Sequence, residues 1–336
     1  MSYNIQGLKS KLSNVDFVHF CDVHDILSFS EINNVTYDEI RKVFVNYEVF
    51  ISYRISCGGG GVAVLVRKDL LPFVTRVQSD IEECVLLHFS DKVFKRPLLA
   101  VFPYIAHESS VFYQNKILNG IENLELTFSS LNCINENVHV LIFGDLNSRV
   151  GQLNETLMNN SINEYVHGLD DCDMVTDNED IPTRRSRDTE QNNYGRQLIQ
   201  FCKINNLFIL NGRTISDPLG SYTCIANGGK SVVDYCIVGR SLYDYVVDLK
   251  VMPRPESDHF ALFLTLKCDF VYTEPTKNIE PINCNSIKML KWNEKYKNVF
   301  NDILNEQFEL HLEDLLSLIN VDINHAIDKF EYQIFF

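Results

Sequence analysis

Leu141-Ile142-Phe143-Gly144-Asp145-Leu146-Asn147 joins an apolar run to two polar side chains at its end. The run Val138–Phe143 has the length and composition of a buried strand, and Gly144 follows it directly. In extended backbone, residues two apart point to the same side, so we expect Asp145 and Asn147 to face one substrate together. Gly, Asp and Asn are also common turn residues, and a plain turn explains the same stretch equally well.

Two carboxylates lie in or at the end of other apolar runs. Glu31 closes the run Asp25–Glu31, where a carboxylate is well placed to hold Mg²⁺, although a loop acid is the simpler interpretation. Asp234 lies inside the apolar run Ser231–Val238, where a carboxylate is costly to bury without a partner. A His is its natural partner; the alternative is an edge strand with this carboxylate facing water.

An acid and an imidazole stand next to each other before a further apolar run. Pro255-Glu256-Ser257-Asp258-His259 precedes Phe260-Ala261-Leu262-Phe263-Leu264. Asp suits a hard cation, and His stabilises or transfers protons on a phosphate. An exposed turn at the entry of a strand is the plainer alternative.

Strand-like segments outnumber helix-like ones. Short apolar runs rich in Val, Ile, Phe and Tyr predict strands at Ile26–Ile32, Tyr47–Tyr53, Gly61–Val66, Cys84–Phe89, Leu98–Tyr104, Val138–Phe143, Leu207–Leu210, Ser221–Ile225, Val232–Val238, Tyr245–Val251 and Phe260–Leu266. Helical spacing of apolar residues predicts helices at Lys11–Cys21, Ser110–Leu131 and Tyr194–Asn205. This mixture indicates large sheets packed together with helices outside, an α/β layered arrangement.

Composition and charge narrow the class of protein. The 336 residues are 45% hydrophobic and 22% charged, as in ordinary globular proteins, and no apolar run approaches the ~18 residues of a membrane span. The net charge of −15 argues against a simple basic nucleic-acid coat. However, most of this negative charge lies in two segments, −7 in residues 154–190 and −5 in residues 271–336. The remainder of the chain is therefore nearly neutral and able to bind phosphates. No secretory signal is seen at the N-terminus, so we expect an intracellular protein.

The polar segments suggest how the chain is divided. Residues 1–270 hold the strands and the main domain, interrupted at 152–193 by an acidic surface loop. Residues 271–290, with two prolines, are predicted to be a linker, and the periodic apolar residues of 291–336 predict a helical segment.

The ten cysteines show no spacing typical of a zinc site or a disulfide framework. The nearest pair in the chain is Cys224 and Cys236, and both lie in apolar strands, where Cys behaves as a small hydrophobe. We therefore expect free thiols in a reducing compartment.

Taken in chain order, the polar positions resemble the motifs of the endonuclease/exonuclease/phosphatase superfamily. They are Asn4, Glu31, Tyr104, Asp145 with Asn147, Asp234, and Ser257-Asp258-His259. Within that superfamily the chain is most similar to the endonuclease domain of non-LTR (LINE-type) retrotransposons. The stretches that carry this likeness are Tyr3-Asn4-Ile5-Gln6-Gly7-Leu8, Gly60-Gly61-Val62-Ala63-Val64-Leu65-Val66, Tyr104-Ile105-Ala106-His107-Glu108-Ser109-Ser110, Gly144-Asp145-Leu146-Asn147-Ser148-Arg149-Val150-Gly151 and Asn193-Tyr194-Gly195-Arg196-Gln197-Leu198 through Asn205-Asn206-Leu207.

The resemblance implies a four-layer α/β sandwich, two face-to-face mixed sheets flanked by helices. Members of the superfamily have several residues before the Asn of the first strand, whereas three precede Asn4 here, so we expect either a shortened first strand or a fragment. The resemblance also implies phosphodiester hydrolysis that depends on Mg²⁺ or Mn²⁺. Glu31 and Asp258 resemble metal ligands, and Asn4 resembles a residue that shapes the metal and phosphate site.

The remaining positions resemble residues that act on the phosphate and the attacking water. Asp145 resembles the residue that activates the water, and Asn147 the one that positions the phosphate. His259, oriented by Asp234, resembles the group that stabilises the pentavalent phosphorane. Tyr104 resembles a phosphate contact or a group that assists the leaving oxygen.

The function implied is a DNA endonuclease that nicks target DNA for retrotransposition, acting in the nucleus if its substrate is chromosomal DNA. The segment around Trp292 resembles the connector before a reverse transcriptase, which would then be a partner encoded in the same element. The motifs equally suit a phosphoesterase acting on inositol phosphates, phospholipids or RNA. An inactive retroelement-derived remnant is the third interpretation.

Overall fold

The structure is a computed structural model that describes residues 1–54, 59–78, 81–113, 116–130, 137–155, 181–226 and 228–268. The chain divides into two compact units, Met1–Tyr272 and Thr273–Phe336, and every described residue belongs to the first. The predicted linker 271–290, the predicted helical segment 291–336 and residues 156–180 of the predicted acidic loop lie outside the described residues.

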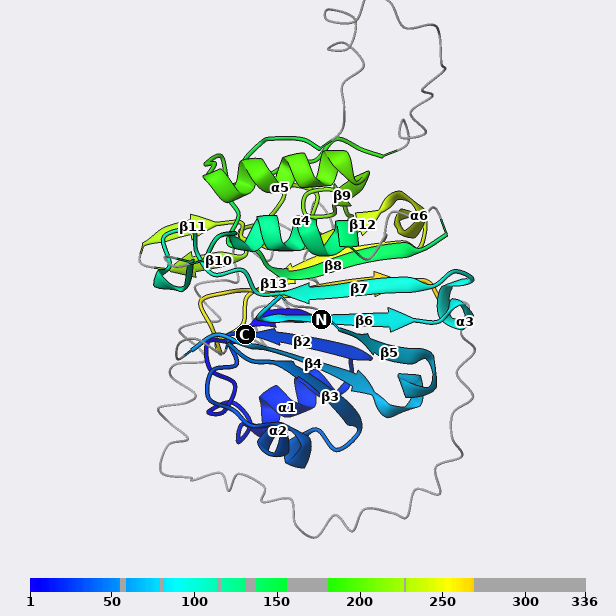
Figure 1. Ribbon diagram of the computed structural model, residues 1–336. Coiled ribbons are helices and arrows are strands. Elements are labelled where there is room, and N and C mark those ends of the chain that lie inside the picture. Colours follow the sequence, from blue (N-terminus) through cyan, green and yellow to red (C-terminus); the bar gives the residue numbers. More distant parts are fainter. Residues whose placement is uncertain are drawn as a thin grey trace, which may run out of the picture. The chain divides into compact units, whose positions relative to one another are not determined.

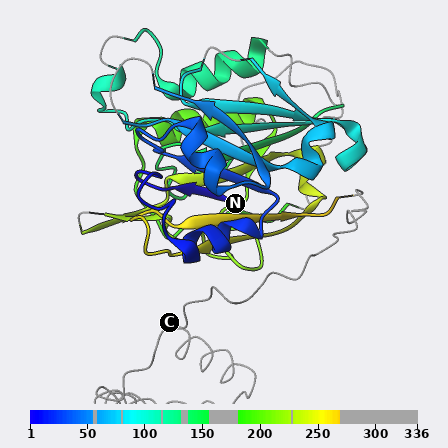
Figure 2. The same ribbon diagram turned by 90° about the horizontal axis from the view of Figure 1, so that it is seen from below.

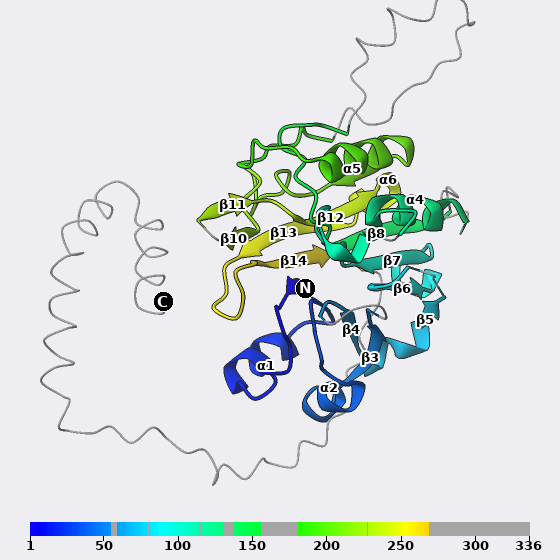
Figure 3. The ribbon, with the colours of Figure 1, turned by 60° about the vertical axis from the view of Figure 1, so that its left-hand side comes forward.

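Two six-stranded mixed sheets form the centre of this unit. The first has the order β13-β14-β1-β2-β4-β3, with bounds Val246–Met252, Ala261–Leu266, Ser2–Asn4, Ile26–Ser30, Val62–Arg67 and Tyr47–Ser52. The second has the order β5-β6-β7-β8-β12-β9, with bounds Val74–Val77, Cys84–Phe89, Leu98–Pro103, His139–Asp145, Asp234–Gly239 and Leu207–Ile209. A separate hairpin joins β10 (Cys224–Ala226) to β11 (Gly229–Ser231) and projects from the sheets (Figure 3).

The outer faces of the two sheets are covered by α1 (Val15–Asp22), α2 (Tyr37–Val43), α4 (Gly120–Ser130) and α5 (Asn193–Ile204). The short helices α3 (Asp91–Phe94) and α6 (Arg240–Tyr243) and the 3₁₀ turn η1 (Lys68–Phe73) instead contribute buried residues to the interface between the sheets, and a second 3₁₀ turn is η2 (Val111–Tyr113). Figure 1 shows α4 and α5 over the second sheet and α1 and α2 under the first. The order of layers is therefore helix, sheet, sheet, helix, and the four-layer α/β sandwich expected from the sequence is confirmed.

Three hydrophobic clusters correspond to the three interfaces between these layers. Phe128 of α4 and Phe201 of α5 pack on the second sheet, and their rings meet edge to face with centroids 5.2 Å apart. Phe17 of α1 and Phe44 after α2 pack on the first sheet. A middle cluster joins the sheets to each other. Each layer thus loses apolar surface to a neighbour, which is the main driving force for folding.

The continuous apolar strands are explained by burial on both faces. In β8, Val140 and Ile142 face the helices, whereas Leu141 and Phe143 face the other sheet. Side chains alternate between faces along a strand, so a strand between two covered faces needs apolar residues at every position. This is why Val138–Phe143 lacks the polar alternation of a half-exposed strand.

Side-chain caps set several helix boundaries that periodicity placed differently. The predicted helix Ser110–Leu131 begins only at Gly120, because the Asn119 side chain accepts hydrogen bonds from the backbone N–H groups of Ile121 and Glu122. The predicted helix Lys11–Cys21 becomes Val15–Asp22 for the same reason, with Asn14 as its cap. Helix α2 was not predicted, although its capping box of Thr36 and Glu39 was a readable signal.

Strand directions bring six strand ends to one edge of the sandwich. Strands β1 and β2 are parallel and end together in the first sheet, as do β7 and β8 in the second, and a hydrogen bond from Asn4 to Asp145 brings both pairs of ends to the same edge. Strand β14 runs antiparallel to β1, and β12 runs antiparallel to β8, so both begin at that edge. Figure 2 shows β14 in gold beside the N-terminus. The short β1 is therefore a central strand, and its last residue, Asn4, lies among these ends.

Among the described helices, none has both the length and the apolar character needed to cross a membrane.

Candidate active site

Asn4 is the hub of a buried polar cluster. Its Nδ2 donates hydrogen bonds to Glu31 Oε1 at 2.9 Å and to Asp145 Oδ2 at 2.8 Å, and lies 3.4 Å from His259 Nε2. The side chain is almost fully buried, at 1% exposure. One amide thus joins the ends of β1, β2 and β8 to the start of β14.

Tyr104 reaches the cluster because β7 and β8 approach very closely. A Cβ atom at Gly144 would lie 2.1 Å from the carbonyl oxygen of Pro103, so only glycine allows this contact. The backbone of Tyr104 then forms a parallel β-bridge with Asp145, and the Tyr104 hydroxyl donates to Glu31 Oε1 at 2.9 Å. The glycine before Asp145 is therefore a packing requirement of the site.

Asp145 and Asn147 are neighbours, but not by the geometry expected from an extended backbone. Strand β8 ends at Asp145, and Asn147 has a left-handed φ of 46°. The Asn147 N–H donates to Asp145 Oδ1 at 2.9 Å, and its Nδ2 donates to the Ile105 carbonyl at 2.9 Å. The stretch is thus a turn and also part of the polar cluster, so the two interpretations of the sequence were not exclusive.

Asp234 and His259 form a buried pair. His259 Nδ1 lies 2.8 Å from Asp234 Oδ2 and 3.1 Å from Oδ1, and the two residues are 4% and 7% exposed. Strand β12 lies between β8 and β9, so the alternative of an edge strand with Asp234 facing water is wrong. The alternative of an exposed His259 is also wrong, because His259 is buried.

Two supporting residues were not found from the sequence. Thr223 Oγ1 accepts hydrogen bonds from the N–H groups of Val233 and Asp234, both at 3.0 Å, and the Thr223 carbonyl accepts from Phe260 N–H at 2.6 Å. Asn211 Nδ2 donates to the Asp234 carbonyl at 3.1 Å. Neither lies near the motifs in the chain, and no sequence signal marks them.

Two acidic residues are direct neighbours on adjacent strands of the second sheet. Asp234 is directly opposite Asp145 in the β12–β8 pairing. Burial, together with the Asp234 carboxylate, raises the pKa of Asp145 from 3.8 to about 8. Burial opposes a charged imidazole, but the Asp234 carboxylate outweighs it and raises the pKa of His259 well above its ordinary value. Burial, and then the Glu31 carboxylate, raise the pKa of Tyr104.

The donor set fits a hard divalent cation. Glu31, Asp145, Asp234 and Asp258 bring four carboxyl groups to this edge, and the only cation paired with any of them within the described residues is His259. Asp258 Oδ1 is buried without a hydrogen-bond partner. Mg²⁺ takes oxygen ligands and needs few carboxylates, so this excess of negative oxygen is suited to it.

The two expected metal-ligating acids occupy different surroundings. Glu31 contacts Asn4 and Tyr104, whereas Asp258 is grouped with Cys224 and His259. A second group with close ligand atoms is formed by Asp145, Asp234 and His259. The roles of Glu31 and Asp258 as ligands stay predictions.

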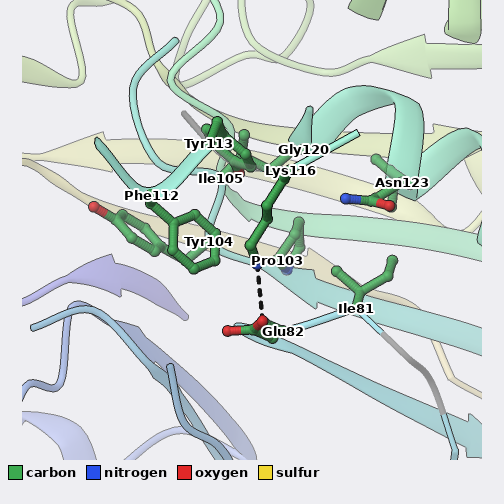
Figure 4. A pocket seen from close by; sticks show the side chains of 11 residues that line it. Ile81, Glu82, Pro103, Tyr104, Ile105, Phe112, Tyr113, Lys116, Gly120 and Asn123 are labelled. Atoms are coloured by element: carbon green, nitrogen blue, oxygen red, sulfur yellow. Dashed lines mark hydrogen bonds and ion pairs between the residues drawn. The ribbon is translucent and has the colours of Figure 1, made fainter. Parts of the chain in front are cut away.

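A small pocket adjoins the cluster at Tyr104. Phe112, Lys116 and Asn123 line it, and Lys116 Nζ is paired with Glu82 at 2.8 Å (Figure 4). Lys116 Nζ also lies 3.6 Å from the centroid of the Phe112 ring, and Arg54 Cζ lies 4.4 Å from it. An aromatic side chain flanked by two cations therefore stands at the edge of the site.

Comparison with solved structures shows the same fold in several nucleases. The AP endonuclease LMAP from Leishmania major aligns with a TM-score of 0.57 at 14% identity, over 79% of this chain and 86% of that one. The catalytic domain of Xenopus laevis APE2 aligns with a TM-score of 0.56 at 17% identity, over 80% and 91%. The endonuclease domain of TRAS1, a telomere-specific non-LTR retrotransposon, aligns with a TM-score of 0.50 at 14% identity, over 79% and 96%.

No curated protein sequence gives a significant match. The sequence profile of the Endonuclease/Exonuclease/phosphatase family, however, matches residues 1–259, a range that includes every residue of the polar cluster. The chain therefore belongs to the Endonuclease/Exonuclease/phosphatase family.

Proposed function

We propose that this chain is a divalent-metal-dependent phosphodiester hydrolase that nicks DNA, and that it derives from a non-LTR retrotransposon. The observation that carries the proposal is the hydrogen-bonded cluster Tyr104–Glu31–Asn4–Asp145 with the Asp234–His259 pair beside it. It combines a base, a charged imidazole and an oxygen-rich set of ligands within one buried site. These are the groups that phosphodiester hydrolysis requires.

The base and the group that stabilises charge are separate residues. Asp145 is held in place by Asn4 and by the N–H of Asn147, and its raised pKa of about 8 gives it the proton affinity of a general base that deprotonates a water molecule. His259 is kept protonated by Asp234, so its imidazolium donates to a phosphoryl oxygen as negative charge develops there. Both groups are fixed by the sheet, so little reorganisation is needed during reaction.

Glu31, Asn4 and Asp258 are the residues that would hold a cation. A bound Mg²⁺ or Mn²⁺ supplies Lewis-acid neutralisation of the phosphate charge. Tyr104 donates its only proton to Glu31, and the raised pKa of its hydroxyl keeps that proton in place. Tyr104 therefore orients the Glu31 carboxylate and presents the phenol oxygen to the pocket.

DNA is favoured over smaller phosphoesters by the sequence stretches that resemble retrotransposon endonucleases. The ring of Phe112 does not add an open stacking face, since it is 8% exposed and flanked by Arg54 and Lys116, and these two cations are paired with Glu83 and Glu82. The identity to solved nucleases is too low to support more than the fold.

Plasmid nicking tests the proposal. Supercoiled DNA is incubated with the purified chain in Mg²⁺, in Mn²⁺ and in EDTA, beside His259→Ala and Asp145→Ala. We expect metal-dependent conversion to open circle that both substitutions abolish while circular dichroism stays unchanged. Parallel reactions with an inositol phosphate, a phosphatidylinositol vesicle and an RNA oligonucleotide test the alternatives. Hydrolysis of one of these without nicking would refute DNA as the substrate, and no hydrolysis at all by the folded chain would support a remnant.

A further inference from the structure

A second set of ligand-type atoms, which includes a sulfur, lies beside the proposed catalytic pair. The Cys224 thiol, an Asp258 carboxylate oxygen and a His259 ring nitrogen all lie within 4.8 Å of one another. Cys224 is 9% exposed and not in a disulfide. Nothing in the proposed hydrolysis uses this thiol.

Backbone pairing forces Cys224 and His259 together. Ile225 N–H donates to the Asp258 carbonyl at 2.9 Å, and Phe260 N–H donates to the Thr223 carbonyl at 2.6 Å. Cys224 and His259 are therefore the non-hydrogen-bonded pair between these two bonds, the arrangement in which side chains approach most closely. Figure 3 shows the β10–β11 hairpin beside the connection from β13 to β14 that carries Asp258.

Asp258, which also belongs to the oxygen-rich donor set, shows that a ligand is missing beside this thiol. Its Oδ1 atom is buried, and no donor within the described residues reaches it. A buried carboxylate oxygen without a partner is costly, since desolvation is then uncompensated. A cation bound by this oxygen and by the two neighbouring side chains removes that cost.

The chemistry of the set selects the ion. Thiolate and imidazole favour Zn²⁺, whereas Mg²⁺ prefers oxygen ligands only. Ligand atoms of a tetrahedral zinc site lie roughly 3.5 Å apart, and separations of at most 4.8 Å close to that distance with small shifts of the side chains. Three protein ligands leave the fourth position to water.

We propose that Cys224, Asp258 and His259 bind Zn²⁺, and that Zn²⁺ bound there inhibits hydrolysis. If the ion takes Nδ1 of His259, it replaces the Asp234 contact at 2.8 Å. If it takes Nε2, it occupies the nitrogen that faces Asn4 at 3.4 Å. In the first case His259 loses the Asp234 contact that orients its ring and keeps it protonated, and in the second case the metal blocks the nitrogen that would donate to the phosphate. The inhibition rests on the proposed function, whereas the binding of the metal does not.

Metal binding is tested first, without activity. Co²⁺ is titrated into the reduced full chain, into Cys224→Ser and Cys224→Ala, and into Cys268→Ser as the matched control, because Cys268 is an exposed thiol outside the set. We expect a thiolate-to-Co²⁺ charge-transfer band in wild type and in the control, which disappears when Zn²⁺ replaces Co²⁺. In both Cys224 variants the absorbance of this band should be lower by the contribution of one thiolate–Co²⁺ site. An identical band in wild type and the Cys224 variants would overturn the site.

Inhibition is tested second, by nicking in excess Mg²⁺ with increasing Zn²⁺, each variant being compared with its own activity without Zn²⁺. Loss of one ligand weakens metal binding at least about tenfold, so the Zn²⁺ concentration for half-inhibition rises by at least that factor in Cys224→Ser but not in Cys268→Ser. Equal inhibition of all variants would place the effect at the oxygen-rich site and overturn the regulatory proposal. If wild type nicks no DNA, the cobalt spectra still decide the binding, and the failure belongs to the proposed function.

Discussion

Replacing Asp145 by Asn separates the stability of the site from its activity. Asp145 is buried and faces the Asp234 carboxylate across the sheet, so its negative charge is unfavourable in the metal-free protein. The amide keeps the shape of the side chain and removes the charge. We therefore expect Asp145→Asn to raise the free energy of unfolding in EDTA while it abolishes hydrolysis.

The magnitude follows from the shifted pKa. A carboxyl whose pKa rises from 3.8 to about 8 binds its proton more tightly in the folded chain than in the unfolded one. Folding stability therefore falls as pH rises between these two values, by about 1.4 kcal/mol for each unit of pKa shift. A shift from 3.8 to about 8 corresponds to a penalty on the order of 5 kcal/mol at pH 8. The amide loses one of the two hydrogen bonds from Asn4 and Asn147, which costs about 1.5 kcal/mol. We therefore expect a net stabilisation of a few kcal/mol.

Urea unfolding in EDTA at pH 5 and pH 8, followed by circular dichroism, measures this difference. Asp217→Asn is the matched control, because Asp217 is also fully buried but accepts the N–H groups of Gly212 at 3.1 Å and Ser221 at 2.7 Å. An amide there leaves one N–H without an acceptor, and we expect a loss of about 1–3 kcal/mol. This variant should still nick DNA.

The two variants must therefore change stability in opposite directions. Destabilisation of Asp145→Asn by about 1.5 kcal/mol or more at pH 8 would refute the electrostatic reasoning, since that is the loss expected from the hydrogen bond alone. Nicking by Asp145→Asn within tenfold of wild type would refute its role as the base. A gain in stability that is the same at both pH values would assign the effect to packing.

Three further predictions follow from other contacts. Asp234→Asn leaves His259 without its carboxylate, so we expect nicking to fall by about 10²–10⁴-fold at unchanged circular dichroism, and a change below tenfold would contradict the pairing. Arg213→Ala strands the fully buried Glu155 carboxylate and should lower the free energy of unfolding by about 3–5 kcal/mol in urea; a loss below 1 kcal/mol would argue against the buried pair. Mg²⁺ should raise the urea midpoint of wild type by linkage, and no shift at millimolar Mg²⁺ would speak against the cation site.

The strands were predictable because their cause is local. Both sheets are covered on both faces, so strands such as β8 had to be apolar at every position, and short runs of Val, Ile, Leu and Phe revealed them. Helix ends were less predictable, because a single side chain such as Asn119 moved the start of α4 to Gly120. The spacing of apolar residues indicates which face of a helix is buried, but it does not indicate the residue at which a capping side chain makes the helix begin or end.

The polar residues of the site could be named from the sequence because each interrupts or ends an apolar run. Glu31, Asp145, Asp234 and His259 were all found in this way, and the order of the motifs indicated the family whose site they resemble. Their contacts could not be derived, since the pairing of β12 with β8 and of β14 with β1 joins segments far apart in the chain. The hub position of Asn4 and the support from Thr223 became visible only with that pairing.

The sequence by itself determined the layered α/β class, the apolar strands and the identity of the chemically competent residues, because these depend on residue type and local pattern. Only the tertiary structure decided that Asp234 is buried opposite Asp145, and that the Cys224 thiol lies beside Asp258 and His259. Spacing along the chain showed no zinc motif at this cysteine. Strand register, which depends on the packing of whole sheets, places these groups within reach of one another.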